Sequence, residues 1–348
     1  MKKLEIETLK NIYAHLNDDL SKNVFEKRIL WSITGDEKYE TMLVDSNPDV
    51  GKMIDRLKYY SRENRKIVVM GNGKIGRRLV NTHDDIKWTA FIDNYPKEEL
   101  LYGLKVYTAE SFLSVYSNEI IVISSKTYAK EMEQQLLHYN IPKENIVNYG
   151  EILNEAMKNQ YFDLKNIKWE DEIFVDLGCR DGETDRFLKE RIKDKLKYIY
   201  AFEPDIDALA NCRKTLDKLA IDYTLIEKGG WSRDTVIYGY MHESGNLVLT
   251  ETKQDKGFMT NVVALDNVLE GKQVTFIKMD IEGAELEALK GSVKTIKKYA
   301  PKLAICVYHK EEDIHDIPAF ILECNPEYKL FLRHYGHNGS ETVLYAIP

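Results

Sequence analysis

The sequence predicts an α/β protein with two sheets, each built from alternating strands and helices. Short β-branched runs recur between stretches in which apolar residues repeat at helical spacing. Strands that alternate with helices form parallel sheets with right-handed crossovers. The alternation starts near Lys66, stops near Gly150 and restarts after Glu170. The chain of 348 residues is long enough for two such domains.

The composition excludes several classes of protein. The net charge is -8 and no long basic block occurs, so we expect no nucleic-acid partner. No apolar run approaches the roughly 20 residues of a membrane span, and no apolar signal core follows Met1. The four cysteines are scattered without a CxxC pair, which is typical of a reducing compartment. We therefore expect a cytoplasmic protein with no membrane span.

Residues 1–64 predict a helical N-terminal region. Apolar residues recur at helical spacing as far as Ile33, and Gly35-Asp36 is a stop signal. Asn47 is a candidate N-cap for a further helix. Amphipathic helices of this kind are typical of packing or oligomerisation. The partner that we expect for them is a second copy of the chain, in a homo-oligomer.

Residues 65–150 predict a small Rossmann-like domain. Its first strand runs into Gly71-Asn-Gly73-Lys-Ile-Gly76, a GxGxxG loop, and Asp93 follows its second strand. Glycines at a helix start can hold a phosphate, and the acid can accept ribose hydroxyls. Two interpretations stay open: a nucleotide or nucleotide-sugar site, and a scaffold without a ligand. The predicted strands are Ile67–Met70, Trp88–Ile92 and Ile120–Ile123.

This domain resembles the small nucleotide-sugar-binding domain at the N-terminus of sugar acyltransferases. The resemblance rests on the strand, the glycine loop and the segment Phe91-Ile-Asp93. It implies a nucleotide or nucleotide-sugar as ligand.

A linker helix is predicted over residues 151–170, and a larger α/β domain over residues 171–348. Seven strands are expected there, and the last two form an antiparallel hairpin around the turn Gly336–Ser340. The strands are Ile173–Leu177, Tyr198–Phe202, Tyr223–Ile226, Phe276–Met279, Leu303–Tyr308, Lys329–Arg333 and Thr342–Ala346.

The first strand of the larger domain ends in a second, acidic glycine loop, Asp176-Leu-Gly178-Cys-Arg-Asp181-Gly182-Glu-Thr184. An acid beside a glycine suits a cationic ligand with an amino-acid end better than it suits a pyrophosphate. Glu203 ends the next strand, where a carboxylate can accept both ribose hydroxyls. Two acids at neighbouring strand ends are costly unless something pairs with them. Trp231, after the third strand, either borders an adenine or packs in the core.

Further segments identify a resemblance for the region from about Asp171 onward. "FIKMDIEGAELEALKG" begins at Phe276, and "LAICVYHK" begins at Leu303. With the glycine loop and "AFEPD", they resemble the FkbM family of methyltransferases. The resemblance implies a Rossmann-type methyltransferase sheet, S-adenosylmethionine as cofactor and O-methylation of a sugar or glycan hydroxyl, on a nucleotide-linked or carrier-linked acceptor. We assign cofactor contacts to Asp176, Gly178, Asp181, Gly182, Thr184, Glu203, Pro204, Gly230, Trp231 and Asp280.

Three polar residues that follow the fourth and fifth strands are the catalytic candidates: Asp280, Glu282 and His309. The ligand crevice of an open α/β sheet lies at the carboxyl ends of its strands. We predict His309 as general base, because histidine titrates near neutrality. Asp280 or Glu282 would orient that base or bind the ligand. We assign no metal; a divalent cation held by all three residues is the alternative.

Two other functions stay open at this point. A NAD-dependent sugar oxidoreductase or epimerase would use the Gly71–Gly76 loop, but Pro142 breaks the helix that its Tyr139 YxxxK match would need. A non-catalytic nucleotide-sugar-binding protein would only bind ligands in both domains. Acceptor-dependent methyl transfer would exclude that function.

Overall fold

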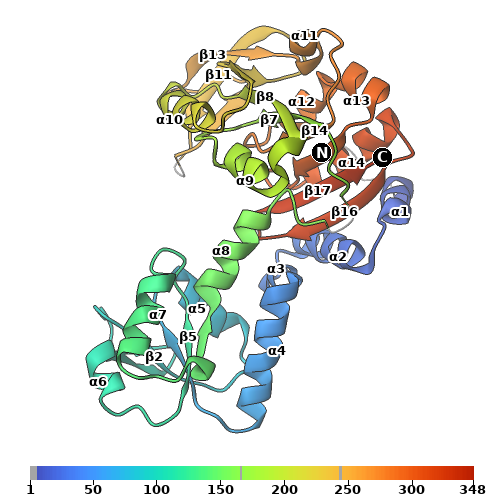
Figure 1. The fold of residues 1–348 in the computed structure, drawn as a ribbon. Coiled ribbons are helices and arrows are strands. Elements are labelled where there is room, and N and C mark those ends of the chain that lie inside the picture. The colour runs from blue at the N-terminus through green and yellow to red at the C-terminus, as the bar shows by residue number, and fades with distance from the viewer. Residues whose placement is uncertain (1–5, 165–166, 243–244) are drawn as a thin grey trace. The chain divides into compact units, whose positions relative to one another are not determined.

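The computed structural model describes residues 6–164, 167–242 and 245–348. The chain divides into two compact units (Figure 1). The larger unit comprises the residues up to Ile29, Gln160–Arg333 and Ser340–Pro348. The smaller unit comprises Leu30–Asn159 and His334–Gly339.

The N-terminal helices are divided between the two units, which differs from the single helical region expected over residues 1–64. The helices are α1 (Ile6–His15), α2 (Asp19–Thr34), α3 (Glu37–Asp45) and α4 (Pro48–Arg62). Helix α1 packs in the larger unit against α14 (Asp313–Cys324). The predicted stop and cap are both present, because α2 ends before Gly35 and the Asn47 side chain accepts hydrogen bonds from the first turn of α4.

A six-stranded sheet forms the centre of the smaller unit, in the order β3-β4-β2-β1-β5-β6. All neighbouring strands run parallel except β3, which is antiparallel to β4. Strands β1 and β5 are wholly buried, as expected where helices cover both faces. The sequence did not reveal the strands β3, β4 and β6. The strands are β1 (Ile67–Met70), β2 (Trp88–Asp93), β3 (Leu100–Leu101), β4 (Leu104–Thr108), β5 (Ile120–Ile123) and β6 (Ile146–Asn148).

Besides α3 and α4, four α-helices belong to the smaller unit among the described residues. Helix α4 packs against α8 and against β1, and α7 packs against β5 and β6. The helices that follow strands are α5 (Lys74–Thr82), α6 (Ala109–Leu113), α7 (Ala129–His138) and α8 (Tyr149–Asn159), with a 3₁₀ turn at Lys143–Asn145.

A seven-stranded sheet forms the centre of the larger unit, in the order β16-β17-β15-β14-β7-β8-β9. Strands β15, β14, β7, β8 and β9 run parallel, and β17 is antiparallel to β15. The predicted Rossmann-type sheet of seven strands with an antiparallel end is therefore confirmed. The strands are β7 (Glu172–Leu177), β8 (Leu196–Phe202), β9 (Tyr223–Ile226), β14 (Phe276–Met279), β15 (Lys302–Cys306), β16 (Lys329–His334) and β17 (Thr342–Ile347).

A second, four-stranded sheet in the larger unit was not predicted. It has the order β10-β13-β11-β12 and lies in sequence between β9 and β14. Its strands are half-exposed and lack the continuous apolar runs of the main sheet. The strands are β10 (Gly229–Gly230), β11 (Thr235–Met241), β12 (Leu247–Thr250) and β13 (Phe258–Val263).

The remaining helices of the larger unit follow its strands in turn. They are α9 (Glu183–Ile192), α10 (Ile206–Asp217), α11 (Leu265–Leu269), α12 (Glu285–Lys290) and α13 (Val293–Tyr299), with a 3₁₀ turn at Lys193–Lys195. Across the described ranges, no helix combines the length and the apolar character that crossing a membrane requires.

Candidate functional site

The candidate site lies where three parallel strands of the larger unit end side by side. In the strand register, Leu177 at the end of β7 pairs with Phe202 of β8 on one side and with Met279 of β14 on the other. The residues that follow these ends, Gly178, Glu203 and Asp280, are therefore brought to one edge of the sheet, as predicted from the sequence.

Two glycines shape the loop after β7. Gly178 has a φ of +83°, and a Cβ there would overlap the backbone oxygen of Asp280. Gly182 has a φ of +78° and is the N-cap of α9. Both positions favour glycine for a backbone reason. The loop therefore passes close against the end of β14, and this approach leaves no room for a side chain.

Glu203 is directed toward this loop. Its Oε2 accepts a hydrogen bond of 2.8 Å from the Arg180 N–H, and its Oε1 accepts one of 2.8 Å from the Asp205 N–H. Burial raises the pKa of the Glu203 carboxyl above its usual value, against the lowering by these two donors. Each carboxylate oxygen has a second lone pair. The fixed carboxylate can thus still accept hydroxyl groups, such as those of a ribose.

Asp176 has a partner that the sequence did not indicate. It is fully buried, and its Oδ1 lies 2.8 Å from the Nζ of Lys278, which is 2% exposed. Burial would lower the pKa of the Lys278 ammonium, but Asp176 and Asp280 raise it above its usual value, so Lys278 is charged. The partner that a buried acid requires is thus present within the chain, as Lys278. Asp176 supports the loop through this pair, and its contact with a cofactor stays a prediction.

Lys278 connects this buried pair to the glycine loop. Its Nζ also donates a hydrogen bond of 2.8 Å to the carbonyl oxygen of Gly178. Asp185, in the first turn of α9, is another fully buried acid near the pair. Burial and the nearby Asp176 raise the pKa of the Asp185 carboxyl well above its usual value. The sequence analysis missed both residues, although a lysine within the apolar run of β14 is a signal of a buried partner.

The other predicted cofactor residues surround the same loop and the end of the third strand. Asp181 is exposed, Thr184 and Pro204 are half-buried, and Gly230 is buried in β10. Trp231 is 6% exposed and packs in an apolar cluster with Ile237, Leu249, Val262 and Ala284. The structure therefore shows core packing for Trp231, and its contact with an adenine stays a prediction.

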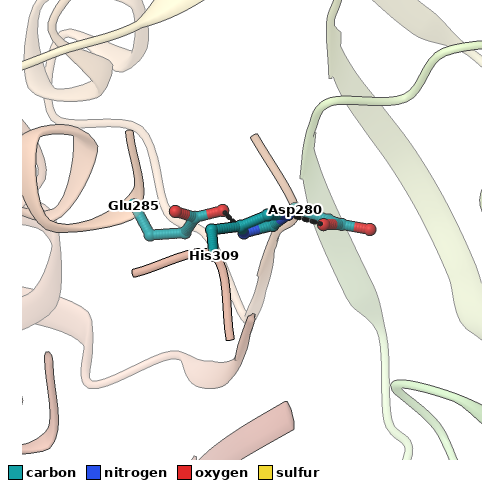
Figure 2. A group of neighbouring side chains, drawn as sticks. All are labelled: Asp280, Glu285 and His309. Carbon is teal, nitrogen blue, oxygen red and sulfur yellow. Dashed lines mark ion pairs between the residues drawn. The ribbon is translucent and has the colours of Figure 1, made fainter. Parts of the chain in front are cut away.

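The three predicted catalytic residues come together beyond β14 and β15. His309 Nε2 lies 3.5 Å from Asp280 Oδ1 and 3.7 Å from Glu282 Oε2. A fourth residue, Glu285 at the start of α12, was not predicted, and its Oε1 lies 3.0 Å from His309 Nδ1. We call these four residues the carboxylate–histidine group. Figure 2 shows the His309 ring between the carboxylates of Glu285 and Asp280.

Two tyrosines fix Asp280. The hydroxyl of Tyr161 donates a hydrogen bond of 2.8 Å to Oδ2, and the hydroxyl of Tyr308 donates one of 3.3 Å to Oδ1. Burial would raise the pKa of Asp280, but Lys278, His309 and Tyr161 lower it below its usual value. Asp280 is therefore a carboxylate in one fixed orientation. Tyr161 lies before the region of FkbM resemblance, so no motif pointed to it.

Glu282 is held in an unusual backbone conformation. Its φ is +55°, which costs a non-glycine residue on the order of 1–3 kcal/mol. Its Oε1 accepts a hydrogen bond of 2.6 Å from Asn246 Nδ2, so Oε2 is left to face His309. Burial raises the pKa of the Glu282 carboxyl, and His309 opposes that effect. Such strain is typical of residues that a function holds in place.

His309 is protonated at neutral pH in this environment. Burial would lower the pKa of its imidazole, but Glu285, Asp280 and Glu282 raise it to about 9. A general base must be unprotonated before it accepts a proton. The structure thus places the predicted base where the sequence indicated, but with a charge state that does not suit that role at pH 7.

The first glycine loop lies in the smaller unit, between β1 and α5. Asp93 accepts a hydrogen bond of 3.0 Å from the Asn72 N–H and one of 2.9 Å from the Tyr95 N–H. A Cβ at Gly73 would meet open space, whereas one at Gly76 would overlap the Gly71 carbonyl oxygen. The strand–loop–helix arrangement that the sequence predicted is present. A nucleotide ligand for it stays a prediction.

Comparison with known proteins identifies two regions. Residues 176–328 match the family described as "Methyltransferase FkbM domain", and residues 63–147 match the family described as "C2185-like, N-terminal". The expected likeness of residues 65–150 to sugar acyltransferases is not confirmed by these matches. No curated protein matches the chain.

Several solved structures are similar to this chain. Methyltransferase FkbM from Methylobacillus flagellatus KT has 21% identity and a TM-score of 0.49, over 86% of this chain and 93% of that chain. Fibrillarin from Aeropyrum pernix with natively bound S-adenosyl-L-methionine has 9% identity and a TM-score of 0.36, over 56% and 74%. SAH-bound methyltransferase PaMTH1 from Podospora anserina has 12% identity and a TM-score of 0.30, over 62% and 95%.

The matched region 176–328 contains the acidic glycine loop, Glu203 and the whole carboxylate–histidine group. Residues 176–328 of this chain therefore match a methyltransferase domain of the FkbM type.

Proposed function

We propose that the protein transfers the methyl group of S-adenosylmethionine to an oxygen atom, namely a hydroxyl of a sugar or glycan. The observation that carries the proposal is the meeting of two features at one sheet edge. These are the Gly178 loop with Glu203, and the carboxylate–histidine group that begins one residue after β14. The first suits a nucleoside, and the second supplies the polar groups that an alcohol acceptor needs.

The residues at the sheet edge fit this cofactor. Gly178 and Gly182 keep the loop free of side chains, and Glu203 has lone pairs directed at the loop for the ribose hydroxyls. The bound cofactor would supply the electrophilic methyl group. The negative charges of Asp280 and Glu282 favour a cationic ligand nearby, because opposite charges attract strongly where water is partly excluded.

The acceptor hydroxyl must be held in line and must lose its proton. Fixed geometry alone contributes a large part of the rate of such a displacement. Asp280, held by two tyrosine hydroxyls, is suited to hold the acceptor by accepting a hydrogen bond. Glu282 has a raised pKa and is thus the stronger base of the two. We assign His309 to charge and positioning rather than to proton removal, because it is already protonated at pH 7.

The sugar class of the acceptor is supported by the resemblance of the domain to the FkbM family. The GxGxxG loop of the smaller unit would bind a nucleotide carried by that acceptor. If it does, the nucleotide-linked sugar should be a better acceptor than the free sugar.

Calorimetric titration with S-adenosylmethionine, followed by a methyl-transfer assay, tests the proposal. We expect one binding site per chain, and we expect Glu203→Gln to weaken binding at least about tenfold, which corresponds to about 1.4 kcal/mol. Glu227→Gln, on the exposed loop after β9, is the matched control and should bind normally. Transfer is then measured on free sugars, nucleotide sugars and oligosaccharides, with the methylated atom located by NMR.

Two results would contradict the proposal. Binding of NAD⁺ without binding of S-adenosylmethionine would assign the function to the loop of the smaller unit. Methylation of nitrogen or carbon in a preferred acceptor would preserve the cofactor and reject the hydroxyl.

A further inference from the structure

The His309 ring has two sides with different neighbours. On the Nδ1 side, Glu285 Oε1 lies 3.0 Å away and also accepts a hydrogen bond of 2.8 Å from the Ile281 N–H. On the Nε2 side, Asp280 and Glu282 lie 3.5 and 3.7 Å away. Hydrogen bonds of this type are usually about 2.9 Å long. The carboxylates on the Nε2 side are therefore too distant for good hydrogen bonds.

Nε2 is a buried polar atom without a hydrogen-bond partner in the described part of the chain. The His309 side chain is 8% exposed, so water has little access to it. A buried polar group of this kind usually has a partner, and its absence points to a missing ligand. The ring directs this atom into the space between Asp280 and Glu282.

The spacing suits a metal ion. Ligand atoms about 2.1 Å from a common cation lie about 3.0 Å apart in octahedral and about 3.4 Å apart in tetrahedral coordination. The separations of 3.5 and 3.7 Å at Nε2 are close to the tetrahedral value. Among the described residues, the group whose ligand atoms all lie within 4.8 Å of one another is Asp280, Glu285 and His309 (Figure 2). Glu282 is outside this group, so its carboxylate would have to approach Asp280 for both to reach one ion. A carboxylate behind a histidine is typical of metal sites, because it orients the ring.

The charges and exposure also favour a cation. Three carboxylates of the group surround one imidazole, and Asp313, a fourth acid, lies nearby. The Lys310 ammonium is directed at the carbonyl oxygen of Gly283. The side chains of Asp280 and Glu282 are 24% and 28% exposed, so an ion can reach them from solvent.

The geometry points to a divalent cation bound by Asp280 Oδ1, Glu282 Oε2 and His309 Nε2, with Glu285 as the carboxylate that orients His309. The ion would displace the proton that the imidazole carries in the metal-free protein. Two carboxylates and one imidazole form a mixed oxygen and nitrogen set, which suits Mn²⁺ and Zn²⁺. The remaining positions on the ion are open to water or to a hydroxyl, whose pKa the ion would lower. This catalytic role rests on the proposed function, whereas binding of the cation does not.

Titration of the EDTA-treated, dialysed full-length protein with MnCl₂ tests the site, with free Mn²⁺ followed by its EPR signal and neither cofactor nor acceptor present. We expect one Mn²⁺ per chain. Glu282→Gln and His309→Gln should each weaken binding at least about tenfold, and Glu285→Gln about 10–100-fold through the orientation of His309. Glu311→Gln, an exposed acid two residues after His309, is the matched control and should bind as the wild type does.

The results separate the site from a general attraction of cations to acids. Absence of Mn²⁺ binding by the wild-type protein overturns the proposal. Equal weakening by Glu311→Gln and Glu282→Gln overturns it as well, because it shows diffuse attraction. Circular dichroism verifies that each variant is folded. Because the Glu282 side chain is partly exposed, Glu282→Gln is the variant for which we expect the smallest effect on folding. Because binding of S-adenosylmethionine is measured separately, a failure of the proposed function leaves the metal result intact.

Discussion

Replacing Lys278 by methionine tests the buried pair beneath the glycine loop. Methionine is similar in length and removes only the charge. Asp176 is fully buried, and Lys278 is 2% exposed, so water cannot replace the lost partner. Breaking such a pair by removing one member costs about 3–5 kcal/mol. We expect Lys278→Met to lower the free energy of unfolding of the larger unit by that amount at pH 7, as measured by urea denaturation.

The loss should depend on pH in a defined direction. Burial raises the pKa of the Asp176 carboxyl above its usual value although Lys278 lowers it, so removal of Lys278 should raise that pKa further. A carboxyl with a raised pKa destabilises the fold above that pKa, and the penalty disappears as the pH falls and the group takes up a proton. The difference from wild type should therefore shrink between pH 7 and pH 5. Lys278→Met should also weaken binding of S-adenosylmethionine, because Gly178 loses its donor.

A matched control lies at the opposite end of the same sheet, on β15 and β7. Lys302 is 14% exposed and lies 2.9 Å from Glu172, which is fully buried. Glu172 also accepts hydrogen bonds from the Thr275 hydroxyl and the Glu170 N–H. Lys302→Met should therefore cost less and leave cofactor binding unchanged. A loss below about 1 kcal/mol for Lys278→Met, or one that does not change with pH, would refute this account of the pair.

Four further predictions follow from the geometry. Gly178→Ala should abolish binding of S-adenosylmethionine in calorimetry and lower stability by more than about 1 kcal/mol, since both φ and space exclude a Cβ; normal binding would contradict the close approach to Asp280. Gly73→Trp, directed into open space, should raise the KM of a nucleotide-linked acceptor without changing cofactor affinity, and an unchanged KM would reject a nucleotide site there. The His309 pKa of about 9 lies above its unfolded value, so protonated His309 should stabilise the fold by up to about 3 kcal/mol below pH 6.5. This stabilisation should disappear as the pH rises through 9. Urea denaturation of His309→Gln should show no such decrease in stability over that pH range. Asp18→Asn should lower the free energy of unfolding by about 1 kcal/mol at pH 7, because Asp18 pairs with Arg333. Burial raises the pKa of Asp18, but Arg333 and Ser21 lower it more strongly, so the loss should disappear once acid protonates Asp18. An equal loss at pH 2.5 in urea denaturation would exclude the ion pair as its source.

The central strands of the main sheet could be predicted from the sequence because they are almost wholly buried. Strands of this kind read as largely apolar runs, and β14 begins and ends where its run does. The edge strand β9 is only half-buried. The strands of the four-stranded sheet are half-exposed, so their pattern resembles that of loops. Short strands such as β6 carry too few residues for any pattern to be distinguished.

The residues of the site could be predicted from the sequence, but their pKa values and charge partners could not. The strand ends identified Asp280, Glu282 and His309, because parallel topology brings such ends together. The pKa of His309 depends on three carboxylates, and one of them, Glu285, appeared only to be part of a helix. The charge partner of Asp176 could not be predicted for the same reason. Lys278 lies about a hundred residues later in the chain and is adjacent to Asp176 only through the register of β7 and β14.

The larger unit is assembled from both ends of the chain, and this has a consequence for its synthesis. The Asn17 N–H donates a hydrogen bond of 2.9 Å to the carbonyl oxygen of Leu330, and Leu16 bridges the same residue of β16, an edge strand. Exposed strand edges invite pairing with other chains. On the ribosome, Leu16 emerges long before β16 exists, whereas nearly all of the smaller unit is contiguous and can fold as it emerges. A segment that is synthesised long before β16 thus pairs with the edge of the seven-stranded sheet. The interval before β16 is synthesised is therefore the stage most vulnerable to misassembly.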